Sequence, residues 1–157
     1  MKITLLTVGK TDVPWVREGL DIYVSRLSHY VPFCVKELPE LKNAGTLSRE
    51  QIKEKEGRAL LGQIAPGDLL TLLDDKGQEM TSVQWASALE ELLVRGTQNL
   101  VFAVGGAYGF SPEVYRRADR KLSLSRMTFS HQMVRVIFAE QLYRAFSILR
   151  GEPYHHE

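Results

Sequence analysis

Apolar residues in this chain fall into short, nearly unbroken runs, separated by longer stretches in which they recur every three or four positions. Short runs of this kind are typical of strands, and the helical spacing is typical of amphipathic helices. The runs predict strands over 2–8, 33–37, 69–73, 100–104 and, more briefly, 122–125. The remaining stretches predict helices at about 12–28, 48–64 and 81–96, a short one after 111, and a long last one over 134–149.

Side chains that favour the start of a helix stand where the pattern places those starts. Each is a residue whose side-chain oxygen can accept a hydrogen bond from the first helical turn. The predicted N-caps are Thr11 or Asp12, Ser48, Thr81 and Ser111. A glutamine three residues after Ser48, and another three after Thr81, completes a capping box. Gly151 and Pro153 end the last helix.

Strands that alternate with helices predict an α/β fold with a mostly parallel sheet and helices on both faces. In such sheets ligands bind at the carboxyl ends of the strands. Leu73, Gly105 and the segment 124–129 all lie at or just past such ends. The glycines at 105, 106 and 109 let main-chain amides approach a ligand with no Cβ in the way. The pattern therefore predicts a ligand site at these strand ends.

The composition is that of an ordinary globular protein. With 157 residues, of which 44% are apolar and 25% charged, we expect a single domain over 1–157. No apolar run approaches the ~20 residues that a membrane helix needs, and the opening strand pattern includes no signal-peptide cleavage site. Cys34 is the single cysteine, so an internal disulfide is impossible, which favours a cytoplasmic location.

The net charge of +1 conceals an uneven distribution. Between positions 116 and 150 there are eight arginines and lysines but two acids. The basic residues are Arg116, Arg117, Arg120, Lys121, Arg126, Arg135, Arg144 and Arg150. Any one of them fits a solvated helix face, whereas their clustering beside a glycine-rich turn is equally consistent with a polyanionic partner.

Several common cofactor motifs are absent or weak. The GGxxG run at 105–109 follows the fourth strand and lacks both the GxGxxG spacing and the later acid of a dinucleotide site, so we exclude NAD. No Gly-Lys-Ser/Thr follows it, which excludes a Walker loop. His155 and His156 are adjacent, but there is no second cysteine, and we expect no metal. No GxSxG motif supports a serine nucleophile.

Four segments of the chain together resemble a known family. They are Gly105-Gly106-x-x-Gly109, Leu124-Ser125-x-Met127-Thr128-Phe129-x-His131-Gln132-Met133-x-Arg135-Val136, Glu140-Gln141-x-Tyr143-Arg144-Ala145 and Pro153-Tyr154-His155. With the opening strand and the helix that holds Trp15, the whole chain is similar to the small ribosomal RNA large-subunit methyltransferases of the SPOUT superfamily. Members of that family methylate N3 of a pseudouridine in bacterial 23S rRNA.

The resemblance implies a cofactor and a topology that the apolar pattern does not predict. Family members bind S-adenosylmethionine in a C-terminal trefoil knot, the SPOUT or α/β-knot fold, and act as homodimers. Carried over to matching positions, the cofactor-binding residues would be Leu73, Gly105, Leu124, Ser125, Arg126, Met127, Thr128 and Phe129. Glycine main chain and apolar walls suit a neutral adenine.

The resemblance also implies candidate catalytic residues. N3 of a pseudouridine carries a proton and is a poor nucleophile until that proton leaves. A neutral histidine could accept it, or an arginine could favour the imidate by stabilising its charge. His155 is the candidate base, Arg135 and Arg144 are candidates for phosphate or carbonyl contacts, and His131 and Tyr154 for shaping the pocket. No spacing selects one proton acceptor.

The weak net charge bears on the substrate. Because phosphate contacts dominate affinity for naked RNA, we expect an assembled ribosome or large subunit, recognised by shape as well as charge. The basic stretch 116–126 would face the RNA, and a twofold dimer could let one subunit's tail complete the other's pocket. Two alternatives stay open: a SPOUT methyltransferase that acts on tRNA, and a non-catalytic, nucleotide-binding, ribosome-associated module.

Overall fold

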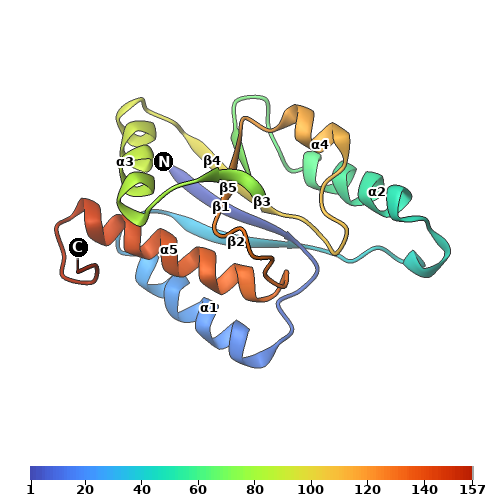
Figure 1. Ribbon diagram of the computed structural model, residues 1–157, viewed down its shortest axis with the longest axis horizontal. Coiled ribbons are helices and arrows are strands. Elements are labelled where there is room, and N and C mark those ends of the chain that lie inside the picture. Colours follow the sequence, from blue (N-terminus) through green and yellow to red (C-terminus); the bar gives the residue numbers. More distant parts are fainter. Residues whose placement is uncertain (157) are drawn as a thin grey trace.

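A five-stranded parallel sheet forms the centre of the molecule, with the strand order β2-β1-β4-β3-β5 (Figure 1). The computed structural model describes residues 1–156. The strands are β1 (Lys2–Val8), β2 (Phe33–Leu38), β3 (Leu69–Glu79), β4 (Asn99–Val104) and β5 (Arg120–Ser123). The α/β class and the parallel sheet predicted from the apolar pattern are therefore confirmed.

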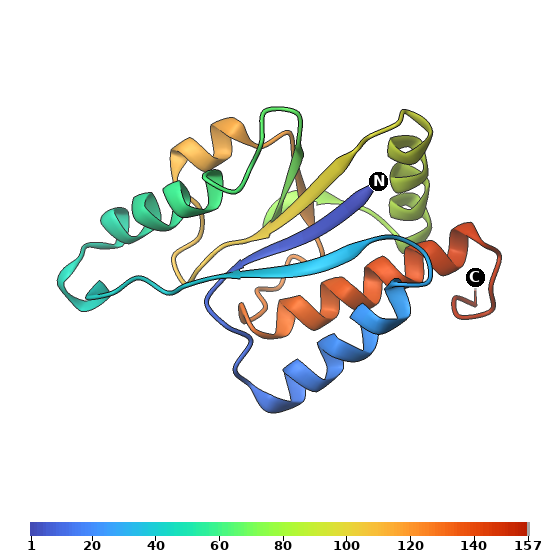
Figure 2. The same ribbon diagram turned by 180° about the vertical axis from the view of Figure 1, so that it is seen from behind.

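Helices cover both faces of this sheet, as predicted (Figures 1 and 2). One face packs against α1 (Pro14–Leu27), α3 (Ser82–Val94) and α5 (Met133–Leu149), and the other against α2 (Arg49–Leu61) and α4 (Pro112–Arg117). A short 3-10 helix, η1 (Ala44–Thr46), lies in the loop before α2. Alternate residues of β4 serve the two cores, since Phe102 packs with the first set of helices and Val101 with the second. No helix of residues 1–156 has the length and apolar character that a membrane crossing requires.

The predicted helix caps are confirmed except at α1. Ser48 and Thr81 each form a complete capping box, and the Ser111 hydroxyl accepts a hydrogen bond from the Val114 N–H. The N-cap of α1 is Val13, with no side-chain cap, so the prediction of Thr11 or Asp12 was wrong. Tertiary contacts explain the difference for Thr11, because its hydroxyl is buried and already accepts a hydrogen bond from an arginine of α5.

Strand β3 extends six residues beyond the predicted 69–73. Its polar second half escaped prediction because it has no apolar run, and an irregularity in register separates Leu73 from Gln78. Gly77 permits β5 to pass close by, since a Cβ at this position would lie 2.8 Å from backbone atoms of Leu122. The close passage positions the chain that follows β5, which forms one wall of the site.

Candidate functional site

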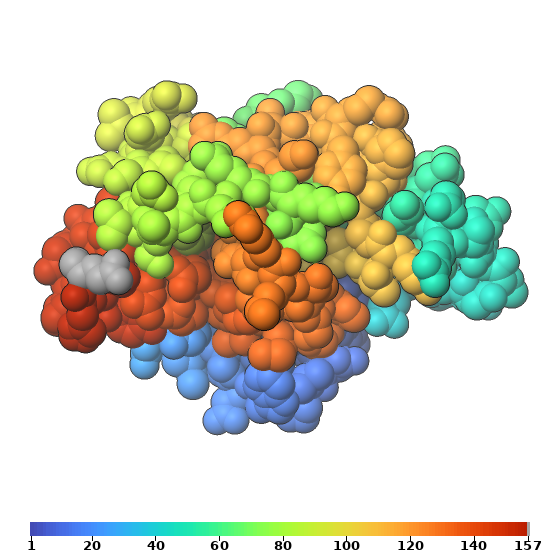
Figure 3. Space-filling model, in the orientation of Figure 1, coloured from blue at the N-terminus to red at the C-terminus, as the bar shows by residue number. Residues whose placement is uncertain are grey.

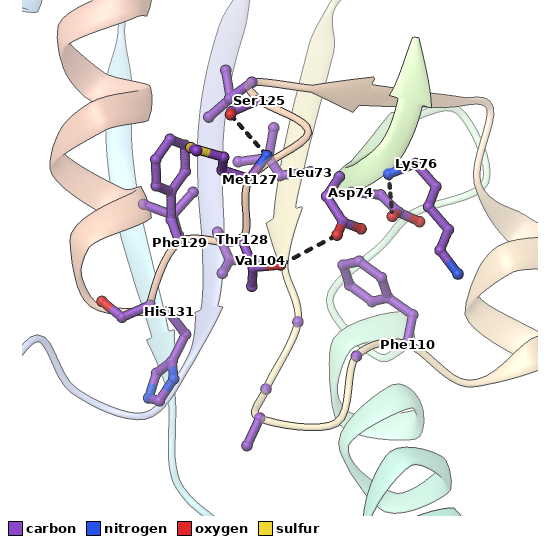
Figure 4. A pocket seen from close by; sticks show the side chains of 18 of the residues that line it. Leu73, Asp74, Lys76, Val104, Phe110, Ser125, Met127, Thr128, Phe129 and His131 are labelled. Carbon is purple, nitrogen blue, oxygen red and sulfur yellow. Dashed lines mark hydrogen bonds between the residues drawn. The ribbon is translucent and has the colours of Figure 1, made fainter. Parts of the chain in front are cut away.

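A cavity of about 520 Å³ opens at the carboxyl end of β4, beside the middle of β3 and the segment that follows β5 (Figure 4). These three parts of the chain meet because β3 lies between β4 and β5 in the sheet. Its lining includes Leu73, Asp74, Asp75, Val104, Gly105, Gly106, Phe110, Leu124, Ser125, Met127, Thr128, Phe129 and His131. In the space-filling view, the segment after β5 lies at the surface beside the end of β3 and above α5 (Figure 3).

The structure brings seven of the eight predicted cofactor-binding residues to this cavity. They are Leu73, Gly105, Leu124, Ser125, Met127, Thr128 and Phe129. The Ser125 hydroxyl accepts a hydrogen bond from the Met127 N–H at 2.9 Å, which fixes the turn between them (Figure 4). Arg126 is not among the lining residues, because its exposed guanidinium turns to Glu79, with an Nε–Oε1 distance of 2.5 Å.

The glycine-rich turn after β4 forms the floor of the cavity with main-chain atoms. Gly109 adopts a positive φ of 83°, and a bridge joins it to Gly106. A Cβ on Gly105 would lie 3.3 Å from the Gly109 backbone, so the turn is closed tightly on itself. A Cβ on Gly106 would instead lie 2.5 Å from Oε1 of Glu56, whose carboxylate packs against the turn from α2. Burial and the nearby Glu40 raise the pKa of Glu56.

Two aspartates in the middle of β3, directly after Leu73, add negative charge to the cavity wall. Asp74 accepts hydrogen bonds from the Tyr115 hydroxyl at 2.7 Å and from the Lys76 N–H at 3.0 Å (Figure 4 shows the second). Burial opposes ionisation, but the Lys76 and Tyr115 bonds outweigh it and hold the pKa of Asp74 below its ordinary value. Burial and the bond to Asp74 raise the pKa of Tyr115 to about 12. Asp75 accepts a hydrogen bond from the Thr128 hydroxyl at 3.4 Å.

Sequence reasoning missed these acids and Glu56. The sequence does indicate the two aspartates, because an acidic pair directly follows the apolar run 69–73, where the pattern predicts the carboxyl end of a strand. No sequence pattern indicates Glu56, because it belongs to a polar helix whose position over the glycine turn depends on tertiary packing. Within residues 1–156, no group of three or more histidines, cysteines or acids could hold a metal ion.

Arg135 does not reach the cavity, although it was a candidate for substrate contact. Its side chain is 0% exposed. The guanidinium donates to the main-chain oxygens of Val8, Gly9 and His131 at 2.9–3.0 Å, and to the Thr11 hydroxyl at 2.8 Å. It thus ties the carboxyl end of β1 to the start of α5. A guanidinium buried in this way cannot contact a phosphate or a base, so its placement contradicts the contact with phosphate or carbonyl groups that was predicted for Arg135.

The other candidate catalytic residues form a group near the far end of α5. Glu140 Oε1 accepts hydrogen bonds from Arg144 Nη2 at 2.6 Å and from the Tyr154 hydroxyl at 3.0 Å. Arg144 Nη1 lies 3.0 Å from His155 Nδ1. Burial and hydrogen bonds to Tyr23 and Glu140 raise the pKa of Tyr154.

The tail is separate from the cavity within one chain. None of Arg144, Tyr154 and His155 lines it, whereas His131 does. Helix α5 has 17 residues, and at ~1.5 Å per residue its two ends are separated by roughly 24 Å. The C-terminus lies at the end of α5 away from the segment after β5 (Figure 1). Glu157, the last residue of the tail, lies outside the described residues.

The family of the chain follows from comparison with known proteins. A family model described as "Predicted SPOUT methyltransferase" matches residues 1–155. This chain belongs to the SPOUT methyltransferase family. Curated relatives named "Ribosomal RNA large subunit methyltransferase H" match it over 100% of both chains. They come from Parabacteroides distasonis (53% identical), Porphyromonas gingivalis (48%) and Flavobacterium johnsoniae (48%).

Outside its cavity, this SPOUT methyltransferase carries basic side chains on α4 and β5. Arg116, Arg120 and Lys121 are exposed, whereas Arg117 pairs with Asp119, with an Nη1–Oδ2 distance of 3.1 Å. The basic stretch predicted from the sequence is therefore a surface, and α4 connects it to the rim of the cavity through Tyr115.

Proposed function

We propose that this chain is an S-adenosylmethionine-dependent methyltransferase that methylates N3 of a pseudouridine in 23S rRNA. The cavity beside β3, β4 and β5 carries the proposal, because it brings glycine main chain and apolar walls together in a SPOUT methyltransferase. Relatives named for ribosomal RNA of the large subunit, aligned over their whole length, support the substrate. The whole chain, 1–157, then acts as a single methyltransferase domain.

The cavity residues fit the cofactor that SPOUT methyltransferases use. Its volume of about 520 Å³ lies within the usual range for a small-molecule site, ~300–1,000 Å³. Main-chain groups around Gly105 and Leu124 would fix the adenine, and Leu73 and Met127 would supply apolar walls. Asp74 and Asp75 add anionic groups to a site for a cationic sulfonium. When bound, this cofactor supplies an activated methyl group.

We also infer that the C-terminal third is threaded as a trefoil knot. The strand order supports this, since the chain leaves β4, passes α4 on one face, enters β5 beyond β3, and reaches α5 on the opposite face. The chain therefore passes β3 on one face of the sheet and returns past it on the other. Protein chains are rarely knotted, so the inference also relies on membership of the SPOUT methyltransferase family.

The tail residues are proposed to act on the acceptor nucleotide. His155 would accept the N3 proton, and the Arg144 guanidinium would favour the imidate by stabilising charge on the neighbouring carbonyl oxygen. Tyr154, held by Glu140, would orient the base. The cavity would hold the reacting groups in line, which supplies much of the rate acceleration in a displacement reaction.

A homodimer is proposed to complete the site. In one chain the tail lies at the other end of α5 from the cavity, so a second copy is needed to bring His155 to a methyl donor. Trp15 (58% exposed) and Ile22 (47% exposed) lie two turns apart on one face of α1, an apolar surface that a partner would cover. The twofold arrangement would place each tail at the other protomer's cavity.

The proposed substrate is the assembled large subunit or ribosome, in the cytoplasm. Arg116, Arg120 and Lys121 would face the RNA, while the net charge of +1 is too weak to grip naked RNA. Transfer of labelled methyl groups to ribosomes, large subunits, free rRNA and tRNA tests this proposal. Label on the ribosomal particles supports it, and label on tRNA alone favours the tRNA enzyme. Calorimetry that detects no S-adenosylmethionine binding would favour a non-catalytic module.

A further inference from the structure

A polar hollow of about 280 Å³ lies between the ends of α1 and α5, on the side of the tail. It is lined by Arg26, His29, Tyr30, Tyr143, Arg150 and Glu152. None of these residues lines the strand-end cavity. The two helices run side by side here (Figures 1 and 2), and the hollow is formed by their last turns and by the short turns that follow them.

Two arginines of the hollow are stacked on tyrosine rings and carry uncompensated charge. The Arg150 guanidinium carbon lies 4.6 Å from the Tyr30 ring centroid, and that of Arg26 lies 5.5 Å from the Tyr143 centroid. Neither guanidinium pairs with a carboxylate in the described part of the chain. Stacking fixes the plane of a guanidinium and leaves its N–H groups free at the edge to bind an oxyanion.

The one acid of the hollow is already engaged. Glu152 Oε2 accepts a hydrogen bond from the Tyr30 hydroxyl at 2.5 Å, and this bond is the largest cause of the rise in the pKa of Tyr30 to about 12. Two guanidiniums and one carboxylate leave a net positive hollow. Arg144 differs, since Glu140 neutralises it.

The hollow adjoins the residues proposed to act on the acceptor base. Tyr143 contacts Tyr30 on one side, with ring centroids 5.8 Å apart, and Tyr154 on the other, with centroids 4.7 Å apart. We propose that the hollow binds a backbone phosphate of the ribosomal RNA strand, next to the nucleotide that the tail engages; this inference rests on the proposed function. Arginine pairs and tyrosine faces are the groups that recognise unpaired RNA strands.

The chemistry of the lining favours an RNA phosphate as the occupant. Guanidinium N–H groups match phosphate oxygens in a bidentate geometry, and the hollow carries two guanidiniums against one carboxylate. A phosphate would also balance the positive charges of Arg26 and Arg150. The phosphate contact would fix the position of the RNA strand on the protein, so that one particular nucleotide lies next to the tail.

Arg26→Gln, Arg150→Gln and the double variant test the proposal, with Arg95→Gln as the matched control. Arg95 is an exposed arginine at the C-cap of α3, far in sequence from the hollow, and its loss changes the net charge equally. Affinity for large subunits is measured against salt concentration, because each lost phosphate contact lowers the slope of log affinity against log salt by about 0.7 for a single strand. We expect each single variant to lose about one contact and roughly 5–10-fold in affinity, the double variant two contacts, and Arg95→Gln neither.

Further measurements keep the outcomes distinct. S-adenosylmethionine affinity by calorimetry and the thermal midpoint should stay at wild-type values, and KM for the subunit should rise while kcat is retained. An unchanged salt slope, or an equal loss in Arg95→Gln, would overturn the proposal. So would conversion of a dimer to a monomer in sedimentation, which would assign the hollow to a second copy. A wild-type protein that binds subunits but transfers no methyl group would contradict the proposed function instead, and the salt slopes would still decide the hollow.

Discussion

Replacing Arg135 by methionine should destabilise the protein far more than it affects the chemistry of the site. The guanidinium is fully buried and joins the end of β1 to the start of α5. Methionine has a similar reach and keeps the apolar part of the packing, but it donates no hydrogen bond. The main-chain oxygens of Val8, Gly9 and His131, and the Thr11 hydroxyl, would each lose a donor; the contacts to Gly9 and Thr11 are buried, and the other two are part-buried.

The magnitude follows from these four acceptors. A buried polar group left without a partner costs about 1–3 kcal/mol, so four at the lower limit cost about 4 kcal/mol. Removal of one partner from a buried charged network gives a similar figure, about 3–5 kcal/mol. Whole domains are stable by only about 5–15 kcal/mol, so the variant should fold but lose a large part of its stability.

Urea unfolding at a fixed protein concentration measures the effect. With a slope of about 2 kcal/mol/M, the midpoint should fall by about 2 M. Arg144→Met is the matched control on the same helix, since this guanidinium is 26% exposed and pairs with Glu140, and its loss should cost about 1 kcal/mol or less. The control should lose methyl transfer and keep its stability. An Arg135→Met midpoint within about 0.5 M of wild type, with methyl transfer lost, would refute the structural assignment.

Three other perturbations have defined outcomes. Gly77→Ala would place a Cβ 2.8 Å from the Leu122 backbone, so β5 must shift; calorimetry should show S-adenosylmethionine affinity reduced at least about tenfold, and wild-type affinity would contradict the coupling. Removal of 154–157 should abolish methyl transfer and leave cofactor affinity within a few-fold, whereas normal turnover would refute the role of the tail. The raised pKa of Tyr30 stabilises the fold below pH 10, and this contribution is lost as pH rises through about 12. Ultraviolet titration of Glu152→Gln should show that the pKa of one tyrosine has moved from about 12 toward 10. An unchanged titration would show that the bond to Glu152 does not raise the pKa of the Tyr30 hydroxyl.

Local chemistry made much of the fold readable from the sequence. Capping boxes at Ser48 and Thr81 act within one helical turn, so their residues alone locate the starts of α2 and α3. The apolar runs of β1 and β4 have no competing interpretation, because strands covered on both faces need nearly continuous apolar sequence. Leu73 and Gly105 could be assigned to a ligand site for the same reason, since ligands of parallel sheets bind at strand ends.

Features that depend on distant partners could not be predicted in this way. Thr11 has the right chemistry for an N-cap, but a guanidinium 124 positions away takes its hydroxyl. The polar half of β3 is a strand because β5 pairs with it, not because of its own pattern. Glu56 reaches the glycine turn only through the packing of α2.

The sequence by itself determined most elements of this protein and the edge of the sheet where its cavity lies, because apolar periodicity and caps act over a few residues. The tertiary structure decided which strands are neighbours, and therefore that β3, the end of β4 and the segment after β5 form one cavity. It also decided that Arg135 is sealed inside and that Tyr154 and His155 lie away from their own cavity. Those outcomes depend on contacts between segments far apart in the chain, which no local pattern encodes.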